Sequence, residues 1–418
     1  MTTPHTGPAL DALDGLSVGD ALGAQFFVPE TARAHLAART DPPGPWPWTD
    51  DTEMACSVYA AHTERGSIDT FDLTHAFACR HDFDRGYGPA ANRMLRLVRE
   101  GGDARRLAAE LFDGQGSYGN GAAMRVAPLG AAYFEDLDEV VQLAARTAVV
   151  THTHPQAVDG AIAVAVAAAL AVRARTASTT PQEFLGAVAL HTPLGAVHEG
   201  LREAIDLAAE EDLRVAARVL GNGSRTSAAD TVPYALWCAA RRLTDYRTAV
   251  REAIAAGGDM DTVAAVTGGV VAARTGTGGI PAAWLAAREP LPDWAFPEPG
   301  SVPGGEGREG MLVPRPFPVP DVVWTDEQWQ RIRTGSGPDT TDHRWRLHTR
   351  EGTLRLCRAD GRARWEVTVV RVRNGWRPVS AVAETAHHRF PQDPDGNPDL
   401  LARILRNAAS GERSALRP

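Results

Sequence analysis

The sequence predicts an all-α body followed by a small C-terminal β-rich α+β appendage. Between residues 9 and 275, apolar residues recur at helical spacing, and no convincing run of alternating apolar and polar residues interrupts them. After residue 341 the pattern changes to period two with glycine-centred turns, which is typical of short antiparallel strands. At 418 residues the chain is too long for one ordinary core, so two parts of unequal size are expected.

The body divides into helices at capping residues, glycines and prolines. The first helix covers 9–24, and its Gly19 and Gly23 predict close approach of another backbone. The segment 122–134 is apolar, with an interruption at Pro128. The other segments of helical composition are 31–37, 51–64, 69–79, 92–100, 103–111, 136–149, 155–175, 181–190, 196–209, 213–220, 231–243, 246–256 and 262–275.

Three regions are expected along the chain. They are a helical body over 9–288, a Pro/Gly-rich linker with a short helix over 289–340, and a small basic domain over 341–418. The short helix is expected over 325–332. In the last region we expect strands over 345–349, 353–358, 365–372 and 376–382 and a closing helix over 398–409.

Charge is unevenly distributed along the chain. The whole sequence has a net charge of −9, yet residues 340–418 contain 15 arginines, no lysine and nine acidic residues. The rest of the chain therefore carries about −15. An acidic body argues against general nucleic-acid binding by the main domain. The basic C-terminal module is either a solvated surface or a surface that binds an acidic target.

Cysteine spacing and apolar runs bear on the compartment. The four cysteines show no CxxC or Cys/His ligand spacing, which is typical of reduced thiols. Residues 1–8 lack the basic and apolar regions of a signal peptide. The most apolar run, 161–172, is too short to span a bilayer and is typical of a buried helix. We therefore expect a cytoplasmic protein with no membrane partner.

Two acidic clusters stand where apolar runs begin. Asp50 and Asp51 precede the first run, and Asp259 and Asp261 precede the second. Taken alone, Asp50 with Glu53 three residues later has the spacing of a capping box. Carboxylates and neighbouring hydroxyls are also the ligands that hard cations such as Mg²⁺ prefer. The two interpretations are compatible, because helix starts from two parts of a bundle can meet and share a metal.

A glycine-rich stretch, GQGSYGNG at 114–121, leads into an apolar segment. Glycines let the backbone approach a ligand closely and point N–H groups at an anion. The stretch is neither a Walker loop nor a dinucleotide fingerprint, because no Gly-Lys-Ser/Thr follows it and no strand precedes it. A purely structural turn is the alternative. Residues 116–121 are called the glycine loop below.

Two histidines, His152 and His154, precede the Ala-rich helix. Their spacing suggests a transition metal, but no third His or Cys accompanies them, so a structural or ligand-stacking role is favoured. Pro155 fits the first position of the helix that follows. Asp82 and Asp84 lie in a loop and have no assigned role.

Together these segments resemble the ADP-ribosylglycohydrolase family, which includes the dinitrogen-reductase-activating glycohydrolases and the ADP-ribosylarginine hydrolases. Several motifs in the family's order make the resemblance specific over residues 10–275, and 341–418 lie outside it. The matching segments are 19–23 (GDALG), 48–52 (WTDDT), 116–125 (GSYGNGAAMR), 151–155 (THTHP), 221–223 (GNG) and 258–262 (GDMDT).

The resemblance implies an orthogonal all-α bundle with two Mg²⁺ ions, or Mn²⁺, in a central cleft. The metal ligands that it implies are Thr49, Asp50, Asp51, Asp259, Asp261 and Thr262. The residues that it implies for the diphosphate and nucleotide of ADP-ribose are Gly116, Ser117, Tyr118, Gly119, Asn120, Gly121 and His154. Metal-bound ribose hydroxyls, an oriented water and nearby carboxylates would then cleave the bond at C1″. The candidates for the catalytic carboxylate are Asp50, Asp51, Asp261 and Asp84.

One position departs from the family pattern. Many members carry a Glu four residues after the second glycine of GDALG, where this chain has Phe27. Residues that would supply the acid instead are Asp82, Asp84, Asp50, Asp51 and Glu30. The expected activity is Mg²⁺-dependent release of ADP-ribose, above all from ADP-ribosyl-arginine on protein. The alternatives are a non-catalytic ADP-ribose-binding protein and a hydrolase of another linkage, such as one to serine or nucleic acid.

Overall fold

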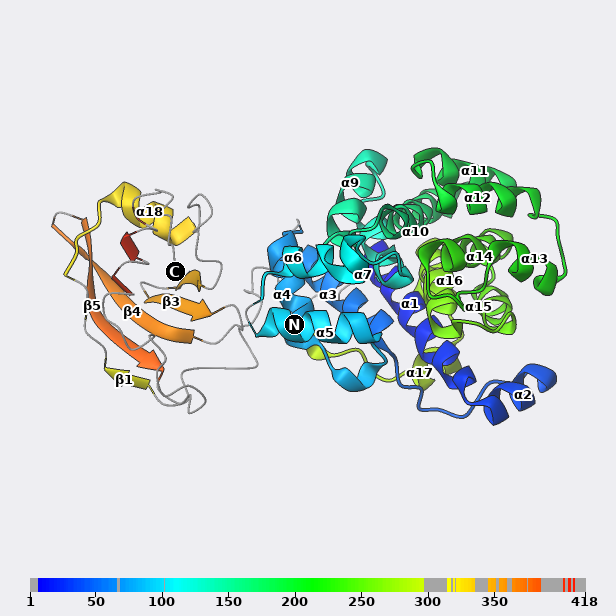
Figure 1. The fold of residues 1–418 in the computed structure, drawn as a ribbon, viewed down its shortest axis with the longest axis horizontal. Coiled ribbons are helices and arrows are strands. Elements are labelled where there is room, and N and C mark those ends of the chain that lie inside the picture. Colours follow the sequence, from blue (N-terminus) through cyan, green and yellow to red (C-terminus); the bar gives the residue numbers. More distant parts are fainter. Residues whose placement is uncertain are drawn as a thin grey trace. The chain divides into compact units, whose positions relative to one another are not determined.

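The computed structural model describes residues 7–65, 68–100, 102–296, 314–316, 319, 321–334, 345–350, 353–358, 363–373, 375–384, 401–402, 405–406 and 409. The chain divides into two compact units. One comprises Met1–Val98 and Gly102–Pro303, and the other comprises Gly304–Pro418 with Arg99–Gly101. Figure 1 shows helices throughout the described part of the first unit and a sheet with a helix in the second.

Helices α1 (Pro8–Ala24) and α16 (Met260–Thr275) form the centre of the first unit. Their backbones touch, because a Cβ on Gly19 would lie only 2.2 Å from Ala264 O. The same close approach recurs one turn later at Gly23. The prediction that these glycines mark a close backbone approach is therefore confirmed, and it explains why the apolar first helix needs them.

The remaining helices of this unit surround that pair (Figure 1). The α-helices are α2 (Pro29–Ala38), α3 (Asp50–Arg65), α4 (Thr70–Arg80), α5 (Pro89–Arg99), α6 (Ala104–Ala109), α7 (Leu111–Gly114), α8 (Ala127–Ala132), α9 (Leu137–Ala148), α10 (Pro155–Arg173), α11 (Pro181–His191), α12 (Ala196–Asp206), α13 (Leu213–Leu220), α14 (Ala228–Arg241), α15 (Tyr246–Ala255) and α17 (Ala282–Ala287). Short 3₁₀ turns are η1 (Gln25–Phe27), η2 (Phe83–Arg85), η3 (Asn120–Ala122), η4 (Ala174–Thr176), η5 (Thr277–Gly279) and η6 (Asp293–Ala295). The prediction of an all-α body is confirmed.

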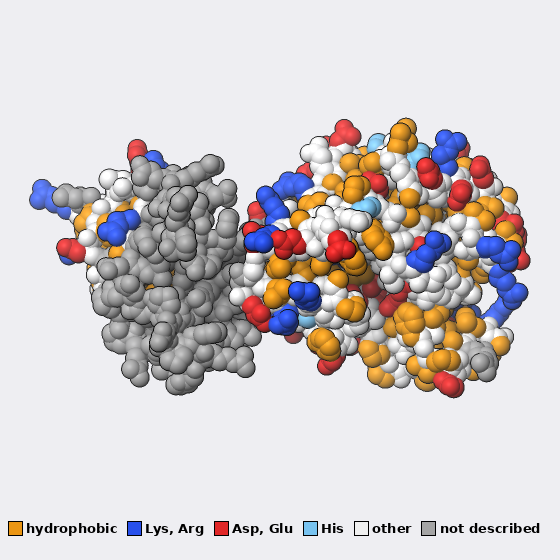
Figure 2. Space-filling model, viewed as in Figure 1, with side chains coloured by type: hydrophobic (Ala, Val, Ile, Leu, Met, Phe, Trp, Pro, Cys, Tyr) orange, Lys and Arg blue, Asp and Glu red, His pale blue; other side chains and the backbone are white. Residues whose placement is uncertain are grey.

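Helix α10 is a core helix. The stretch Pro155–Thr176 is long and apolar enough to cross a membrane, but 83% of its most apolar window is buried inside the body. On the face drawn in Figure 2, basic, acidic and hydrophobic side chains of the body are interspersed.

Several element boundaries differ from the sequence prediction, two of them at prolines. Pro128 does not interrupt a helix but lies in the first turn of α8, where its missing N–H has no helical partner to lose. Helix α5 begins at Pro89 for the same reason. Helix α17 was not predicted.

Residues 287–296, called the strap below, run along α3 in what we expected to be the start of a linker. Trp46 N donates to Ala287 O at 2.7 Å, and Glu289 N donates to Trp46 O at 2.9 Å. Further along, the Trp48 indole donates to Pro290 O at 3.3 Å. These bonds attach the strap to the segment that leads into α3.

The second unit is an antiparallel sheet with strand order β1-β5-β4-β3-β2. Its strands are β1 (Pro314–Pro316), β2 (Trp345–Arg350), β3 (Thr353–Arg358), β4 (Ala363–Val372) and β5 (Gly375–Glu384). The four predicted strands are confirmed. Strand β1 is an addition from the expected linker, and its two prolines suit an edge position.

Helix α18 (Asp326–Thr334) confirms the predicted short helix, but it packs on this sheet, whereas the prediction placed it in the linker. Trp329 and Ile332 of α18 share one core with Trp365 and Val367 of β4. The closing helix expected over 398–409 lies mostly outside the described residues, of which 401–402, 405–406 and 409 are helical. The predicted fold class, a helical body with a small α+β appendage, is confirmed.

Candidate active site

Asp20 on α1 holds the start of α3. Its Oδ2 accepts hydrogen bonds from Thr49 N at 2.9 Å, Thr52 N at 3.1 Å and Thr52 Oγ1 at 2.5 Å, and its Oδ1 accepts from Thr49 Oγ1 at 2.8 Å. The first N–H groups of a helix need such acceptors, and here a carboxylate from another helix supplies them. Because Asp20 is fully buried, this turn is fixed deep within the body.

Asp50 and Glu53 do not form the capping box that their spacing suggested. Glu53 Oε2 instead accepts from Tyr87 OH at 2.6 Å and from Asp82 N at 3.1 Å. Since Asp20 already satisfies the amides at the start of α3, Glu53 is free to tie α3 to the loop after α4. That part of the capping interpretation is wrong.

The two acidic helix starts meet, as predicted. In the first turn of α16, Thr262 Oγ1 donates to Asp51 Oδ2 at 3.4 Å, and Thr49 Oγ1 lies 3.3 Å from the same oxygen. Asp261 Oδ1 accepts from Thr262 N at 2.7 Å, and Asp259 is the residue before α16. The group called the acidic cluster below comprises Thr49, Asp50, Asp51, Asp259, Asp261 and Thr262.

One buried carboxylate, Asp51, and three half-buried ones dominate this cluster. Burial, followed by repulsion from Asp20, raises the pKa of Asp50 to about 8, and the same causes hold the pKa of Asp51 well above its usual range. Burial and the adjacent Asp259 likewise raise the pKa of Asp261. Asp51 Oδ1 is buried and makes no hydrogen bond within the described residues. An unpaired carboxylate oxygen that lies among other carboxylates can act as a ligand for a hard cation.

Over the described part of the chain, no group of three or more His, Cys, Asp and Glu side chains is already arranged to hold a metal ion. Repulsion among carboxylates without a counter-charge opposes such an arrangement. The possible metal ligands of the cluster also include the hydroxyls of Thr49 and Thr262, which are not among those four residue types. All of these ligand atoms are oxygens, so the cluster fits a hard cation.

Asn120 joins the glycine loop to the acidic cluster. Its Nδ2 donates to Asp259 Oδ2 at 2.7 Å and to Thr231 Oγ1 at 3.0 Å. Within the loop, Gly119 N donates to Ser117 Oγ at 3.2 Å. Two segments far apart in sequence thus form one site.

The glycine loop also packs against the histidine segment. A Cβ on Gly116 would lie 2.0 Å from Thr153 Oγ1, and a Cβ on Gly121 would lie 2.8 Å from His152 Cε1. Gly116 has a φ of +75°, which favours glycine. Side chains at these two positions would push the two segments apart.

The histidines have separate roles. His152 Nδ1 lies 2.7 Å from Thr151 Oγ1, and burial together with the charge of Arg125 lowers the pKa of His152 to about 3. It is a neutral, structural side chain. His154 is the N-cap of α10, and its Nδ1 accepts from Gln156 N at 3.1 Å.

An aromatic surface lies beside the glycine loop. The Phe112 and Tyr118 rings are 5.8 Å apart and tilted, and the Tyr118 and His154 rings are 5.8 Å apart and edge-on. Phe112 is 49% exposed, although its φ of +52° is costly for a residue with a Cβ. The strained turn thus presents a ring to solvent next to two predicted substrate contacts.

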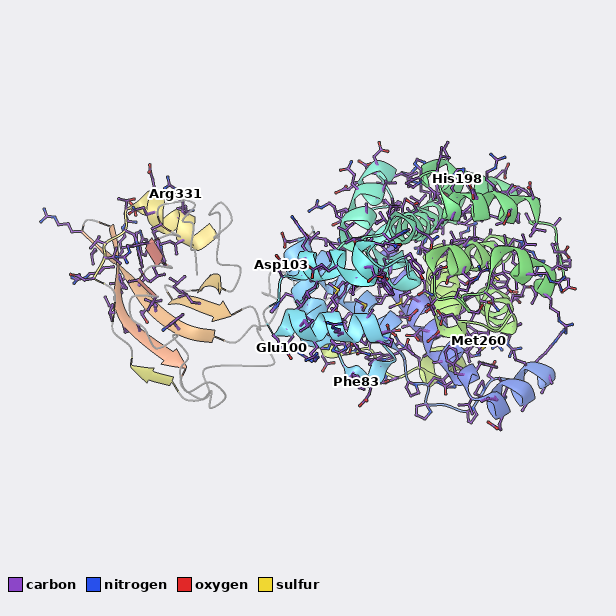
Figure 3. All side chains as sticks on the ribbon, in the orientation of Figure 1. Phe83, Glu100, Asp103, His198, Met260 and Arg331 are labelled. Carbon is purple, nitrogen blue, oxygen red and sulfur yellow. The ribbon has the colours of Figure 1, made fainter. Side chains whose placement is uncertain are left out.

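Asp84 lies on η2, near the residue that Figure 3 labels Phe83. The side chain of Asp84 is exposed, and its N–H donates to Asp82 Oδ1 at 3.0 Å. The same loop reaches the cluster at Gly86, where a Cβ would lie 3.8 Å from Asp50 Oδ1. Asp84 is therefore at the rim of the site and not inside the cluster.

Phe27 and Glu30 both face solvent. Phe27 ends η1 with a 49% exposed side chain, and Glu30 lies in the first turn of α2.

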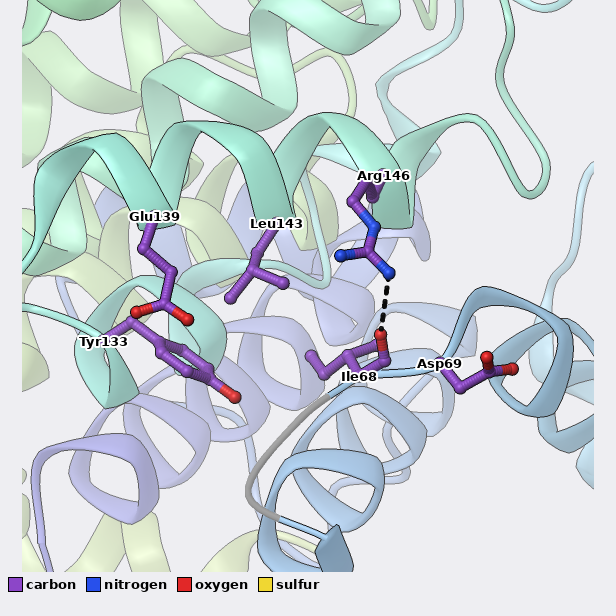
Figure 4. Close-up of a pocket in the computed structure, with 6 residues that line it drawn as sticks. All are labelled: Ile68, Asp69, Tyr133, Glu139, Leu143 and Arg146. Carbon is purple, nitrogen blue, oxygen red and sulfur yellow. Dashed lines mark hydrogen bonds between the residues drawn. The ribbon is translucent and has the colours of Figure 1, made fainter. Parts of the chain in front are cut away.

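A small hollow of about 240 Å³ lies elsewhere, between α9 and the start of α4 (Figure 4). Its lining shares no residue with the acidic cluster, and consists of Ile68, Asp69, Tyr133, Glu139, Leu143 and Arg146.

Comparison with known proteins assigns the chain to a family. The sequence profile described as ADP-ribosylglycohydrolase matches residues 2–298. The chain belongs to the ADP-ribosylglycohydrolase family. The resemblance inferred from the ordered motifs is thereby confirmed, together with the prediction that the chain is a glycohydrolase enzyme.

The chain is similar to several relatives within the ADP-ribosylglycohydrolase family. The ADP-ribosylhydrolase ARH3 of Bos taurus is 30% identical over 320 residues, which cover 65% of this chain and 86% of the relative. An uncharacterised protein of Archaeoglobus fulgidus is 32% identical over 295 residues, covering 68% and 91%. A solved structure named as an ADP-ribosylglycohydrolase-related protein complex has a TM-score of 0.50 at 29% identity, covering 68% of this chain and 92% of that chain.

Three residues that lie around the acidic cluster and the glycine loop were not singled out from the sequence. Asp20 lies within the GDALG motif, and the signal that was overlooked is an acid on the buried side of an apolar helix. Phe112 gave no signal, because its strained turn is visible only in the backbone. Glu289, whose contacts are described below, stood in a stretch that composition assigned to the linker.

Proposed function

We propose that this chain is a Mg²⁺-dependent hydrolase that cleaves the C1″ glycosidic bond of ADP-ribosylated substrates and releases ADP-ribose. The observation that carries the proposal is the hydrogen bond from Asn120 to Asp259, which joins the glycine loop to the acidic cluster. It sets oxygen ligands beside a loop whose amides suit a diphosphate. ADP-ribosyl-arginine on protein is the proposed substrate, because a cationic guanidinium suits an acidic cleft.

In this proposal two Mg²⁺ ions, or Mn²⁺, are held by Thr49, Asp50, Asp51, Asp259, Asp261 and Thr262. The unpaired Asp51 Oδ1 and the crowding of carboxylates around it support a cation here. When bound, Mg²⁺ supplies Lewis-acid charge to ribose hydroxyls and lowers the pKa of a water.

The substrate's diphosphate is proposed to lie on the glycine loop. Backbone N–H groups of glycines can approach phosphate oxygens closely, and the contacts with His152 and Thr153 hold the loop in place. The adenine ring of the substrate would then stack on the exposed rings of Phe112 and Tyr118, next to His154. This arrangement orients the ribose toward the acidic cluster.

The chain's own carboxylates are proposed to move the protons. In hydrolysis the water oxygen bonds to C1″, and the bond from C1″ to the leaving nitrogen breaks. One proton of the water passes to a carboxylate, and an acid gives a proton to the leaving group. Asp50, Asp51 and Asp261 are the candidates within the cluster. Asp84 is the candidate at the rim, on the loop that reaches Asp50.

A non-catalytic ADP-ribose-binding protein is the second candidate function. The observation that favours it is the exposed Phe27 at the position where many family members carry a carboxylate. The same cleft would then bind ADP-ribose without turnover.

The test uses purified full-length protein with Mg²⁺ and three substrates, carrying ADP-ribose on arginine, on serine or on a nucleic-acid end. We expect ADP-ribose release, measured by chromatography, to be fastest from arginine. Asp261→Asn should lose at least about 100-fold in rate, because a cluster carboxylate is removed. The matched control is Asp138→Asn, an exposed acid in the first turn of α9, which should keep the wild-type rate.

The outcomes separate the candidate functions. Release from serine or nucleic acid alone would keep the hydrolase and reject the arginine linkage. Calorimetric binding of ADP-ribose without release from any substrate would select the binding protein. Neither binding nor release, in protein shown to contain metal, would reject both.

A further inference from the structure

Arg85 on η2 reaches the peptide that leads into α3. Its Nη1 donates to Trp48 O at 3.0 Å, and the centre of its guanidinium lies 3.5 Å from the Trp48 ring centroid. Trp48 directly precedes Thr49, the first member of the acidic cluster. One cation therefore holds both the backbone and the side chain at the approach to the cluster.

Glu289 on the strap fixes this guanidinium. Arg85 Nη1 donates to Glu289 Oε2 at 2.8 Å, and Nη2 donates to Oε1 at 2.9 Å, so the pair is a two-pronged fork. The strap is itself bonded to Trp46 and Trp48 through backbone and indole groups. Arg85 thus lies between the two segments that border the start of α3.

The loop that carries Arg85 is attached to α3 at further points. Asp82 N and Tyr87 OH both donate to Glu53, one turn after Asp50. Gly86 follows Arg85 with a φ of +88°, and a Cβ there would lie 3.8 Å from Asp50 Oδ1. The loop, the strap and the start of α3 are therefore connected around Arg85.

We propose that Arg85 and Glu289 are positioning residues of the active site. Their ion pair clamps the turn that carries Thr49, Asp50 and Asp51, so that the oxygens of this turn stay directed at the bound cation. The inference rests on the proposed function, because it takes the acidic cluster as a cation site. It adds two residues that do not belong to the acidic cluster or to the glycine loop.

The geometry shows how the clamp works. The turn that carries Thr49, Asp50 and Asp51 follows directly on Trp48, so movement of the Trp48 peptide would move the oxygens of this turn. Arg85 holds that peptide with three contacts from one rigid plane, namely the Trp48 carbonyl, the Trp48 ring and the Glu289 fork. Lysine has the same charge but neither the fork nor the flat face. We therefore expect lysine to be a poor replacement.

The test measures Mn²⁺ affinity by calorimetry on full-length Arg85→Ala, Arg85→Lys and Glu289→Gln proteins. We expect about tenfold or greater loss of affinity in both Arg85 variants and a smaller loss in Glu289→Gln. The matched control is Arg175→Ala. Arg175 also holds a carbonyl, Ala273 O at 2.8 Å, and a carboxylate, Asp11 Oδ2 at 2.7 Å, with similar exposure, but neither belongs to the acidic cluster.

A second readout does not depend on metal. Hydrogen exchange of the amides at the start of α3, measured in metal-free protein, should accelerate in Arg85→Ala and stay unchanged in Arg175→Ala. Mn²⁺ affinity of Arg85→Ala within twofold of wild type, or an equal loss in Arg175→Ala, would overturn the clamp. If wild type binds no Mn²⁺, the metal part of the proposed function fails, and the exchange rates alone decide whether Arg85 orders this turn.

Discussion

Asp20 shows how one buried carboxylate can fix the start of the helix that carries Asp50 and Asp51. Burial raises its pKa, and the hydrogen bonds from Thr52 and Thr49 lower it, so these four donors offset much of the cost of burying the group. A carboxylate in this position also attaches the first turn of α3 directly to α1 by hydrogen bonds. The orientation of the neighbouring cluster oxygens therefore depends on a residue one layer behind them.

Replacing Asp20 by Asn tests this dependence. An Asn whose oxygen takes the Oδ2 position keeps three of the four hydrogen bonds but loses the negative charge, and its NH₂ group replaces the acceptor that faces Thr49 Oγ1. We expect the free energy of unfolding to fall by about 1–2 kcal/mol in urea titrations. Mn²⁺ affinity should fall as well.

The control is Asp136→Asn, at the exposed N-cap of α9. Asn is also a good N-cap residue, so we expect a change within about 0.5 kcal/mol and unaltered Mn²⁺ affinity. If Asp20→Asn unfolds at the same urea concentration as wild type, the proposed role of Asp20 is wrong.

At the scale of elements, local signals predicted most of the helices, because caps and first-turn prolines fix where a helix begins. Helix α11 begins at Pro181 with a complete capping box from Thr180 and Glu183. The strap escaped prediction for the opposite reason, since its structure comes from hydrogen bonds to Trp46 and Trp48, far away in sequence. Contacts of that kind leave no periodic pattern.

The packing of α1 on α16 predicts that alanine at two different glycines changes the free energy of unfolding in opposite directions. Gly19→Ala adds a Cβ at 2.2 Å from Ala264 O, so the two central helices must separate. We expect a loss of about 2–3 kcal/mol in the free energy of unfolding. Gly186→Ala lies inside α11 with nothing within 4 Å of its added Cβ, and should gain about 1 kcal/mol from helix propensity.

Chemical denaturation of both alanine variants measures these changes. Because α16 carries the second acidic helix start, Gly19→Ala should also weaken Mn²⁺ binding, whereas Gly186→Ala should leave it unaltered. Equal stability changes at the two positions would contradict the close packing of α1 on α16.

At the scale of the whole molecule, the family match covers residues 2–298, while the second unit has its own core around Trp324, Trp329 and Trp365. The sequence predicted the change from helix to strand because the periodicity itself changes. It also predicted that the two acidic helix starts meet, through ordered motifs. Neither source predicted which neighbouring groups hold the site in place, since Asp20 and Glu289 act through tertiary contacts. Target binding by the basic C-terminal module stays a prediction.

The acidic cluster predicts that the stability of the whole helical unit depends on pH and on metal. In metal-free protein the folded state raises the pKa of Asp50 to about 8, so folding retains a proton that the unfolded chain releases near pH 4. The stabilisation of the folded state by this proton is fully present below about pH 4 and is lost as pH rises toward about 8. We expect the free energy of unfolding in EDTA to fall by up to about 1.4 kcal/mol per pH unit for each such proton.

Asp50→Asn separates this effect from other titrations. Without the ionisable group, the variant in EDTA should be more stable than wild type at about pH 8 and should show a shallower pH dependence. Mg²⁺ should stabilise wild type most at high pH, because it binds the ionised carboxylates, and should stabilise Asp50→Asn much less. Urea titrations at several pH values, with EDTA or Mg²⁺, measure all four slopes. If wild type in EDTA becomes more stable as pH rises from about 5 to 8, the buried carboxylates do not control stability as their environment requires.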